Sequence, residues 1–457
     1  MSALTAGKNV LLIVVDTLRA DHLSGYGYPK PTSPRLDRFA AGAVRFESCI
    51  AHAPWTIPSF TSILSGLDPI QHRVVASPWN VPNHRHLGFD DTVPTLAEVM
   101  REAGYETFAV DNLVEMLSHP SWFVRGFHQY VNLTDRLGLR HHHVLAEQVT
   151  DAFLGWRPVR GDRPWFAFLH YWDPHTPYNY PRSYDRLIDA EPPAAIEGAG
   201  GRPYLPRIGY ADAVDPWRLE LVAQYDRSIR YADDEIGRLL DRLGDRGALD
   251  DTVVVFSGDH GEAMVEHGVE FNHSLLYEPT VHVPLVVFDP GTPAAVIPDV
   301  VQHADLAPTL LRLCGLGGEE RLPGRVLPPW GDPGQRRPFA VSCQDGGAAL
   351  RSLRTREWKL VCRYRLDAEP ARRGAVESAE LYDLAADPYE LHDLAGSRAG
   401  VRDELLGRLA SWCREAAAGG PGDPLLDPGL HVDFDDFPGD PVLAEFYRSL
   451  RENPPAR

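Results

Sequence analysis

The chain has 457 residues, of which 44% are hydrophobic and 24% charged, and its formal net charge is −19. This composition is ordinary for a globular protein and excludes wholesale disorder, and the length suits a large domain plus a smaller one. The acidic excess argues against a nucleic-acid partner, because binding a phosphate backbone requires clustered Lys and Arg. It does not exclude a small anionic substrate, since a metal ion can supply local positive charge.

The sequence gives no sign of membrane attachment or export. No apolar run reaches the roughly 18 residues of a membrane helix, so we expect no membrane partner. The N-terminal apolar run Val10–Val15 is too short for a signal-peptide core and has no small-residue cleavage site after it. The chain has an odd number of cysteines without metal-type spacing, which predicts a reduced, cytoplasmic setting. They are Cys49, Cys314, Cys343, Cys362 and Cys413.

Strand-like and helical patterns alternate along the chain. Continuous apolar runs predict strands that are buried on both faces of a sheet, and apolar residues at helical spacing predict helices. In chain order we expect a strand at Val10–Val15, a helix from about Thr56 to Leu64 that Gly66 ends, a helix in Thr92–Gly104, a strand at Trp165–Tyr171, a helix in Leu219–Leu243, and strands at Thr252–Phe256 and Val283–Phe288. This alternation predicts an α/β domain with a central, mostly parallel sheet flanked by helices.

Pro- and Gly-rich segments divide the chain. Thr176–Pro216 has little periodicity and is interpreted as a long loop or lid near the site. Leu322–Pro338 suits a domain boundary; strand-like Arg354–Tyr364 and an amphipathic helix at Val401–Ala417 follow it, as in a small α+β domain. We therefore predict a catalytic domain at 1–338, a small C-terminal α+β domain at 339–418 and an irregular tail at 419–457.

Two acidic residues follow predicted buried strands. Asp16 comes directly after Val10–Val15, and Asp259 and His260 come after Thr252–Phe256 and a Ser-Gly turn. A single Asp at such a place is often only a helix cap or turn residue. Ligands of open α/β sheets, however, bind outside the carboxyl ends of the strands, and Asp and His from separate strand ends can share one divalent cation.

The predicted helix before Gly66 begins with hydroxyl residues. Thr56 or Ser59 would be an ordinary N-cap. The same position also favours a nucleophile, since a helix N-terminus stabilises negative charge and a metal contact activates a hydroxyl. The residues alone leave both interpretations open.

The chain resembles the sulfatase family of the alkaline phosphatase superfamily over nearly its whole length, to about Ala417. Eight segments match in the correct order, which makes the resemblance specific. They are Asn9–Gly27 with Thr32–Asp37, Trp55–Gly66, Thr95–Thr107, Asp173–Pro177, Ser257–Glu262, His273–Pro284, Val301–Gly315 and Glu380–Leu394. The resemblance implies an alkaline-phosphatase-like large domain and a metal-dependent ester hydrolase.

Several positions depart from the family pattern. Thr56 stands where the family has the Cys that becomes formylglycine, and Phe60 stands where it has Arg. Asp111 and Asn112 occupy the segment of a family Lys, and Thr17 replaces a second Asp. The metal pattern is similar to that of the phosphonate monoester hydrolase and phosphodiesterase branch, which favours phosphodiesters or phosphonate monoesters.

The resemblance leads to a hypothesis for the site. Asp16, Thr56, Asp259 and His260 would hold one divalent ion (Ca, Mn, Mg or Zn), and Thr56 would attack a small anionic phosphate or sulfate ester in a double displacement. His273 would protonate or stabilise the departing oxygen, and His175 would contact the transferred group or the leaving oxygen. Asn80 and Asn112 are weaker candidates for substrate contacts.

Several alternatives stay open from sequence. Asp173, His175 and His273 could complete a two-metal site, although their spacing differs from that of two-metal relatives. The chain could also be a sulfatase that uses unmodified Thr, a phosphoryl-group transferase or an inactive binding protein. Assembly into a homo-oligomer is left open as well.

Overall fold

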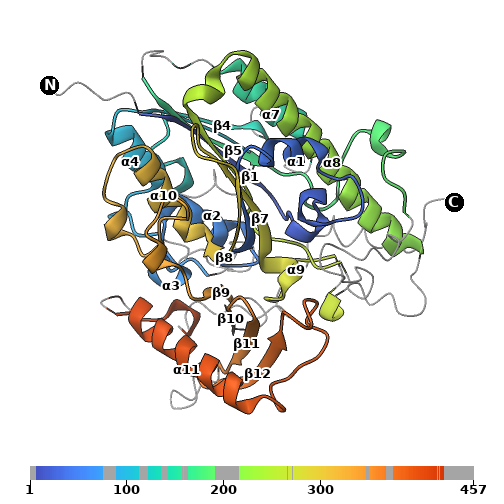
Figure 1. Ribbon diagram of the computed structural model, residues 1–457, viewed down its shortest axis with the longest axis vertical. Helices are drawn as coiled ribbons and strands as arrows, with labels where there is room; N and C mark the ends of the chain where they lie inside the picture. The colour runs from blue at the N-terminus through green and yellow to red at the C-terminus, as the bar shows by residue number, and fades with distance from the viewer. Residues whose placement is uncertain are drawn as a thin grey trace.

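The computed structural model describes residues 7–75, 89–112, 122–134, 143–156, 158, 163–190, 216–264, 266–269, 271–345, 349–366, 374–418, 420 and 422–426. An eight-stranded sheet in the order β4-β3-β5-β1-β6-β7-β2-β8 forms its centre, with helices on both faces (Figure 1). The strands are β1 (Asn9–Val15), β2 (Val44–Ile50), β3 (Glu106–Asp111), β4 (Gln129–Asn132), β5 (Trp165–Tyr171), β6 (Thr252–Gly258), β7 (His282–Phe288) and β8 (Ala295–Gln302). The predicted α/β fold is confirmed.

The sheet is mostly parallel, as predicted. β1 pairs in parallel with β5 and β6, and β3 with β4 and β5, whereas β7 runs antiparallel to both β6 and β2. A run of apolar residues reads the same in either direction, so the sequence predicted β7 but not its orientation. β2 (VRFESCI) was not predicted, because its Arg, Glu and Ser interrupt the apolar run.

The two faces of β1 belong to two separate cores. Val10, Leu12 and Val14 pack in one cluster, and Leu11, Ile13 and Val15 pack in the other. The first cluster includes residues of α2 (Thr56–Ser65), α4 (Leu96–Glu102) and α10 (Leu306–Leu313). The second includes residues of α1 (Pro34–Ala40), α7 (Ala146–Gly155) and α8 (Pro216–Asp245). The short helices α3 (Pro69–His72) and α9 (Glu278–Val281) complete this part of the fold.

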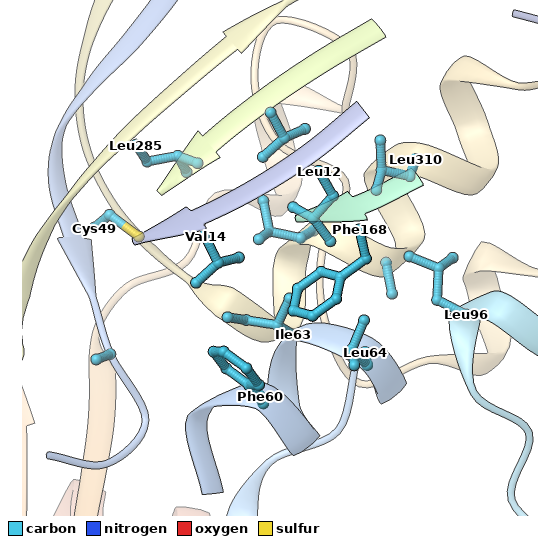
Figure 2. Close-up of a cluster of buried hydrophobic side chains, with 14 of the residues drawn as sticks. Leu12, Val14, Cys49, Phe60, Ile63, Leu64, Leu96, Phe168, Leu285 and Leu310 are labelled. Atoms are coloured by element: carbon cyan, nitrogen blue, oxygen red, sulfur yellow. The ribbon is translucent and has the colours of Figure 1, made fainter. Parts of the chain in front are cut away.

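Helix α2 is buried along its length against the sheet (Figure 2). Phe60 and Ile63 lie under Val14 and Phe168, and the rings of Phe60 and Phe168 meet edge to face at 5.4 Å. The helix ends at Gly66, whose φ of 70° is unfavourable for residues with a side chain. This packing fixes the start of α2 relative to the carboxyl ends of β1 and β5.

A four-stranded antiparallel sheet in the order β12-β11-β10-β9 and a long helix form the C-terminal part (Figure 1). Its elements are β9 (Ala340–Gln344), β10 (Ala349–Arg354), β11 (Trp358–Tyr364), β12 (Val376–Asp383) and α11 (Ala399–Ala416). The stretch predicted as strand-like contains the end of β10, a turn and all of β11. The domain limits at 338 and 418 stay predictions.

Some predicted segments fall largely outside the described residues. Of the proposed lid, 191–215 lie outside, and the described part contains one 3-10 turn, Arg182–Tyr184. Of the tail, only 420 and 422–426 are described, and Asp423 forms an ion pair with the buried Arg351. No helix among the described residues is both long and apolar enough to span a bilayer. The cytoplasmic location remains a prediction.

Candidate active site

Neighbouring strands bring Asp16, Asp259 and His260 together. β1 and β6 are parallel with Val15 opposite Gly258, so the next residue of each strand is one of the two acids. All three side chains are fully buried, and one potential ligand atom from each lies within 4.8 Å of the others. Within the part of the chain that the structure describes, this is the one such cluster of three or more His, Cys, Asp or Glu residues.

Each carboxylate uses one oxygen for the protein and leaves the other unpaired. Oδ1 of Asp259 accepts hydrogen bonds from the backbone N–H groups of Thr17 (3.1 Å) and His260 (2.7 Å), and its Oδ2 has no hydrogen-bond partner within the described part of the chain. Oδ2 of Asp16 accepts from His170 and from Thr56, and no described residue donates a hydrogen bond to its Oδ1. A turn or capping role therefore accounts for only one of the two carboxylate oxygens of Asp259. Buried unpaired oxygens are costly, and a cation would satisfy both.

His260 presents a free nitrogen lone pair to these acids. Its Nδ1 donates to the carbonyl of Gly261 at 3.0 Å, so the lone pair is on Nε2. Nε2 lies 3.4 Å from Oδ2 of Asp259 and 3.6 Å from Oδ1 of Asp16. Burial lowers the pKa of His260 to about 4, so the ring is neutral at pH 7. A neutral imidazole fixed through its second nitrogen is the usual form of a metal-ligating His.

The two carboxyl groups oppose one another electrostatically. Burial, and then the charge of Asp16, raise the pKa of Asp259 well above its ordinary range. Burial by itself would raise the pKa of Asp16. The nearby His175, His170 and His260 together outweigh burial, so the net effect is a lowered pKa. Without a cation, the charge of Asp16 therefore disfavours ionisation of Asp259. The residues fit one divalent ion, and the imidazole makes the donor set better suited to Mn or Zn than to Ca, which prefers oxygen.

Thr56 is the first residue of α2, and its hydroxyl faces this cluster. Its Oγ1 lies 3.2 Å from Nε2 of His260 and 3.5 Å from Oδ2 of Asp16. The N-cap position belongs to Trp55, and the hydroxyl of Ser59 donates to the carbonyl of Ala53 at 3.0 Å. Capping therefore accounts for neither hydroxyl. Thr56 combines the positive end of a ten-residue helix with contacts to two of the proposed ligands.

His273 and His175 lie next to the cluster. The ring centroid of His273 is 4.8 Å from that of His260 and 5.5 Å from that of His175. Burial, with the neighbouring His260 and His175, lowers the pKa of His273 well below its ordinary value, so it is neutral. Nδ1 of His175 donates to the carbonyl of Thr176 at 2.9 Å, which leaves its Nε2 for another partner. An indole ring packs against each histidine: Trp55 meets His273 edge to face with ring centroids 4.8 Å apart, and Trp172 lies tilted against His175 with centroids 4.1 Å apart.

The other residues considered for the site, Asp173, Asn112 and Asn80, lie at different places in the chain. Asp173 interacts with the backbone of Ala146 at the start of α7, and burial raises its pKa to about 8. Among the described residues, Asp173, His175 and His273 do not form a group that could hold a second metal ion. Asn112 is buried at the carboxyl end of β3, where its backbone carbonyl accepts from Thr134. Asn80 lies outside the described residues.

The sequence did not single out His170, which contacts Asp16 directly. His170 lies on β5 with Nε2 3.2 Å from Oδ2 of Asp16 and Nδ1 2.7 Å from Oδ1 of Asp111. Burial lowers the pKa of His170, but both carboxylates outweigh it and raise it to about 10. The sequence offered one signal for His170. It is an ionisable residue in the otherwise apolar and aromatic run WFAFLHY, where a buried polar group needs a partner.

Comparisons with known proteins identify the family. The family described as "Sulfatase" matches residues 8–316, and the one described as "N-sulphoglucosamine sulphohydrolase, C-terminal" matches residues 265–412. The chain therefore belongs to the sulfatase family, whose members are ester hydrolases of the alkaline phosphatase superfamily.

Individual relatives cover most of the chain at low identity. Iduronate 2-sulfatase of Homo sapiens is 26% identical over 87% of this chain and 82% of its own length. Choline-sulfatase of Rhizobium meliloti is 25% identical, over 90% and 88%. The crystal structure of a phosphonate monoester hydrolase of Agrobacterium radiobacter superposes with a TM-score of 0.72 at 21% identity, covering 90% of this chain and 96% of that one. This last likeness shows a shared fold.

Proposed function

We propose that the protein hydrolyses phosphodiesters or phosphonate monoesters by a metal-dependent double displacement, with Thr56 as the nucleophile. The observation that carries the proposal is the position of the Thr56 hydroxyl. It lies at the N-terminus of α2, 3.2 Å from His260 and 3.5 Å from Asp16, beside two unpaired carboxylate oxygens.

Asp16, Asp259, His260 and Thr56 are the residues that would hold the cation. When bound, a divalent ion lowers the pKa of a coordinated hydroxyl and offsets negative charge on the transferred group. The chain contributes the rest of the activation. The helix N-terminus stabilises the developing alkoxide of Thr56, and the buried packing of α2 holds the hydroxyl in one orientation for attack.

His175 and His273 are placed to contact the substrate. The pKa of His273 is low, so it acts as a neutral ring that donates an N–H hydrogen bond to the leaving oxygen, which stabilises charge there. Nε2 of His175, opposite the nitrogen that bonds Thr176, would bind an oxygen of the transferred group or of the leaving group. Both roles require a small anionic ester in the space beside Trp55 and Trp172.

The preference for phosphorus rests on the chemistry of threonine. The formylglycine hydrate of the family has a second hydroxyl that can expel sulfate without attack at sulfur. Thr56 has a single hydroxyl, so water must attack the central atom of the covalent intermediate. That step is ordinary at phosphorus. The family membership favours a second candidate, a sulfatase that uses unmodified Thr56.

A side-by-side assay separates these functions. Aryl sulfate, phosphate monoester, phosphodiester and phosphonate monoester substrates are compared with Mn²⁺ present. We expect the wild-type protein to turn over the phosphodiester and the phosphonate monoester. Thr56→Ala should lose this turnover, and Thr56→Ser should keep part of it because it keeps the hydroxyl. Turnover of sulfate alone would contradict the proposal and support the second candidate.

Two further outcomes would point elsewhere. Products in which an added alcohol, and not water, receives the phosphoryl group would indicate a transferase. Unchanged activity in Thr56→Ala together with unchanged metal content in Asp259→Ala would indicate a binding protein without this chemistry.

A further inference from the structure

His170 is a fully buried imidazole between two carboxylates. Its Nδ1 faces Oδ1 of Asp111 at 2.7 Å, and its Nε2 faces Oδ2 of Asp16 at 3.2 Å. Ionised carboxylate oxygens only accept hydrogen bonds, so both ring nitrogens donate. His170 thereby holds Oδ2 of Asp16, which the Thr56 hydroxyl also contacts at 3.5 Å. The other oxygen, Oδ1, has no hydrogen-bond partner among the described residues.

A chain of contacts holds His170 in this orientation. The hydroxyl of Tyr130 on β4 donates to Oδ2 of Asp111 at 2.8 Å, so both oxygens of that carboxylate are engaged. The ring of Phe60 packs edge-on against the imidazole, with centroids 4.7 Å apart. Phe60 and Asp111 are both departures from the family pattern, and both contact this one residue.

The sheet topology produces this alignment. β4, β3, β5 and β1 are adjacent parallel strands, and His170 pairs in register with Val14, two residues before Asp16. Tyr130, Asp111 and His170 therefore run along the carboxyl edge of the sheet and end at a proposed metal ligand.

We propose that His170, held by Asp111 and Tyr130, is a positioning residue that turns Asp16 so that Oδ1 alone faces the cation. The inference rests on the proposed metal-dependent function, because it assigns Asp16 to a metal. Removing a residue that orients a metal ligand through a hydrogen bond typically lowers metal affinity or activity roughly 10- to 100-fold. His170 does not touch the substrate in this scheme and acts only through Asp16.

Two substitutions separate positioning from simple packing. The amide nitrogen of Gln falls near Nε2 of His, whereas that of Asn falls near Nδ1. His170→Gln therefore keeps the donor to Asp16, and His170→Asn keeps only the contact with Asp111. A role in packing alone would change the stability of the two variants according to the side-chain volume lost, and it would leave the Mn²⁺ affinity of the folded proteins unchanged.

The measurements are Mn²⁺ affinity of the metal-free protein by calorimetry, the Mn²⁺ electron paramagnetic resonance spectrum, and kcat and KM. We expect His170→Asn to bind Mn²⁺ roughly 10- to 100-fold more weakly with an altered spectrum, and His170→Gln to stay near wild type. Equal behaviour of the two variants, or wild-type affinity and spectrum in His170→Asn, would overturn the proposal.

A second pair of variants covers the case in which His170→Asn does not fold. Tyr130→Phe removes only the hydroxyl that anchors Asp111, and we expect it to weaken Mn²⁺ binding in the same direction by a smaller factor. Its matched control is Tyr28→Phe, in a second buried trio where Tyr28 donates to Asp226 at 2.6 Å and Asp226 pairs with His22 at 2.8 Å. Equal Mn²⁺ affinity in Tyr130→Phe and wild type would count against positioning.

The outcomes also separate this inference from the proposed function. A wild-type protein that binds no Mn²⁺ would contradict the metal-dependent function itself. A wild-type protein that binds Mn²⁺ and hydrolyses the esters, with a His170→Asn variant that does so equally well, would contradict only the positioning role.

Discussion

Two of the buried charge clusters in the molecule differ in how their charges are balanced. Where the C-terminal sheet meets α9, Lys359 forms ion pairs with Glu278 at 3.0 Å and Glu390 at 2.9 Å. Arg354 also approaches Glu278, at 3.4 Å. At the carboxyl edge of the central sheet, Asp16 and Asp259 each have one oxygen without a hydrogen-bond partner among the described residues. The two acids and His260 lie close enough to share one cation.

The pKa values show the same contrast. Burial raises the pKa of Glu278, but Lys359 and Arg354 outweigh it and lower it strongly. Burial and Asp16 both act to raise the pKa of Asp259. Lys359 and Arg354 thus balance Glu278, although burial raises the pKa of the neighbouring Glu390 to about 7. At the sheet edge, Asp16 and Asp259 form the site where we propose that a cation binds. This difference distinguishes a structural charge cluster from a candidate ligand site.

The largest effect is expected at Asp259. Asp259→Asn keeps an oxygen for the N–H groups of Thr17 and His260 but removes a proposed metal ligand. We expect hydrolysis to fall by more than the roughly 100-fold typical of residues outside the ligand set. We also expect the melting temperature of the metal-free protein to rise, because a like charge disappears from the buried pair. Retained activity, measured with the phosphonate and phosphodiester substrates, would break the comparison.

The ion-pair cluster of Lys359, Glu278 and Glu390 should respond in the opposite way, by losing stability when its charge is removed. Lys359→Met leaves Glu278 and Glu390 buried without their shared cation, and breaking a buried pair costs about 3–5 kcal/mol. Denaturant unfolding followed by fluorescence measures this loss. The matched control is Arg408→Met on α11, which removes an exposed pair with Glu404 and should cost under about 1 kcal/mol. A near-neutral Lys359→Met would show that this cluster is not held by its charges.

Metal addition sharpens the contrast. Mn²⁺ at 100 times its dissociation constant should stabilise the wild-type protein by about 2.7 kcal/mol, and a chelator should reverse the effect. The Asp259→Asn protein should gain little, while Glu278→Gln should gain as much as wild type despite its lower starting stability. Thermal unfolding with and without Mn²⁺ provides the measurement. An equal gain in Asp259→Asn would place the ion elsewhere.

A pH-dependent stability is expected from Asp173, a buried acid. Burial raises its pKa from 3.8 to about 8 in the folded protein. A raised folded-state pKa gives stability that is complete below the unfolded value and is lost as the pH rises through the folded one. The stability of wild type relative to Asp173→Asn should therefore fall from about pH 4 to about pH 8 and then level off. A difference in melting temperature that does not change with pH would contradict this.

Local sequence determined much of the fold and the three central site residues. The runs Val10–Val15 and Thr252–Phe256 are apolar on both faces, which only a sheet covered on both sides accommodates, and that pattern predicted β1 and most of β6. Asp16, Asp259 and His260 follow these runs directly, so their neighbourhood followed from the strands. The start of α2 at Thr56 and its end at Gly66 were also readable locally.

Tertiary structure alone decided the partners of the other polar residues. His170 and Asp111 lie 59 positions apart in the sequence and meet because β3 and β5 are neighbours in the sheet. Cys343 and Cys362 seemed scattered, yet both pair in register with Arg351 on β10.

Lys359 and Glu278 look like ordinary surface charges in the sequence, and only the packing of the C-terminal sheet on α9 buries them. Hydrophobic periodicity is a property of neighbouring residues, so the sequence determined which segments are buried strands and helices and which acids follow them. The pairing of a buried charge depends on strand order and register, which are set by contacts between distant segments, and these only the folded chain reveals.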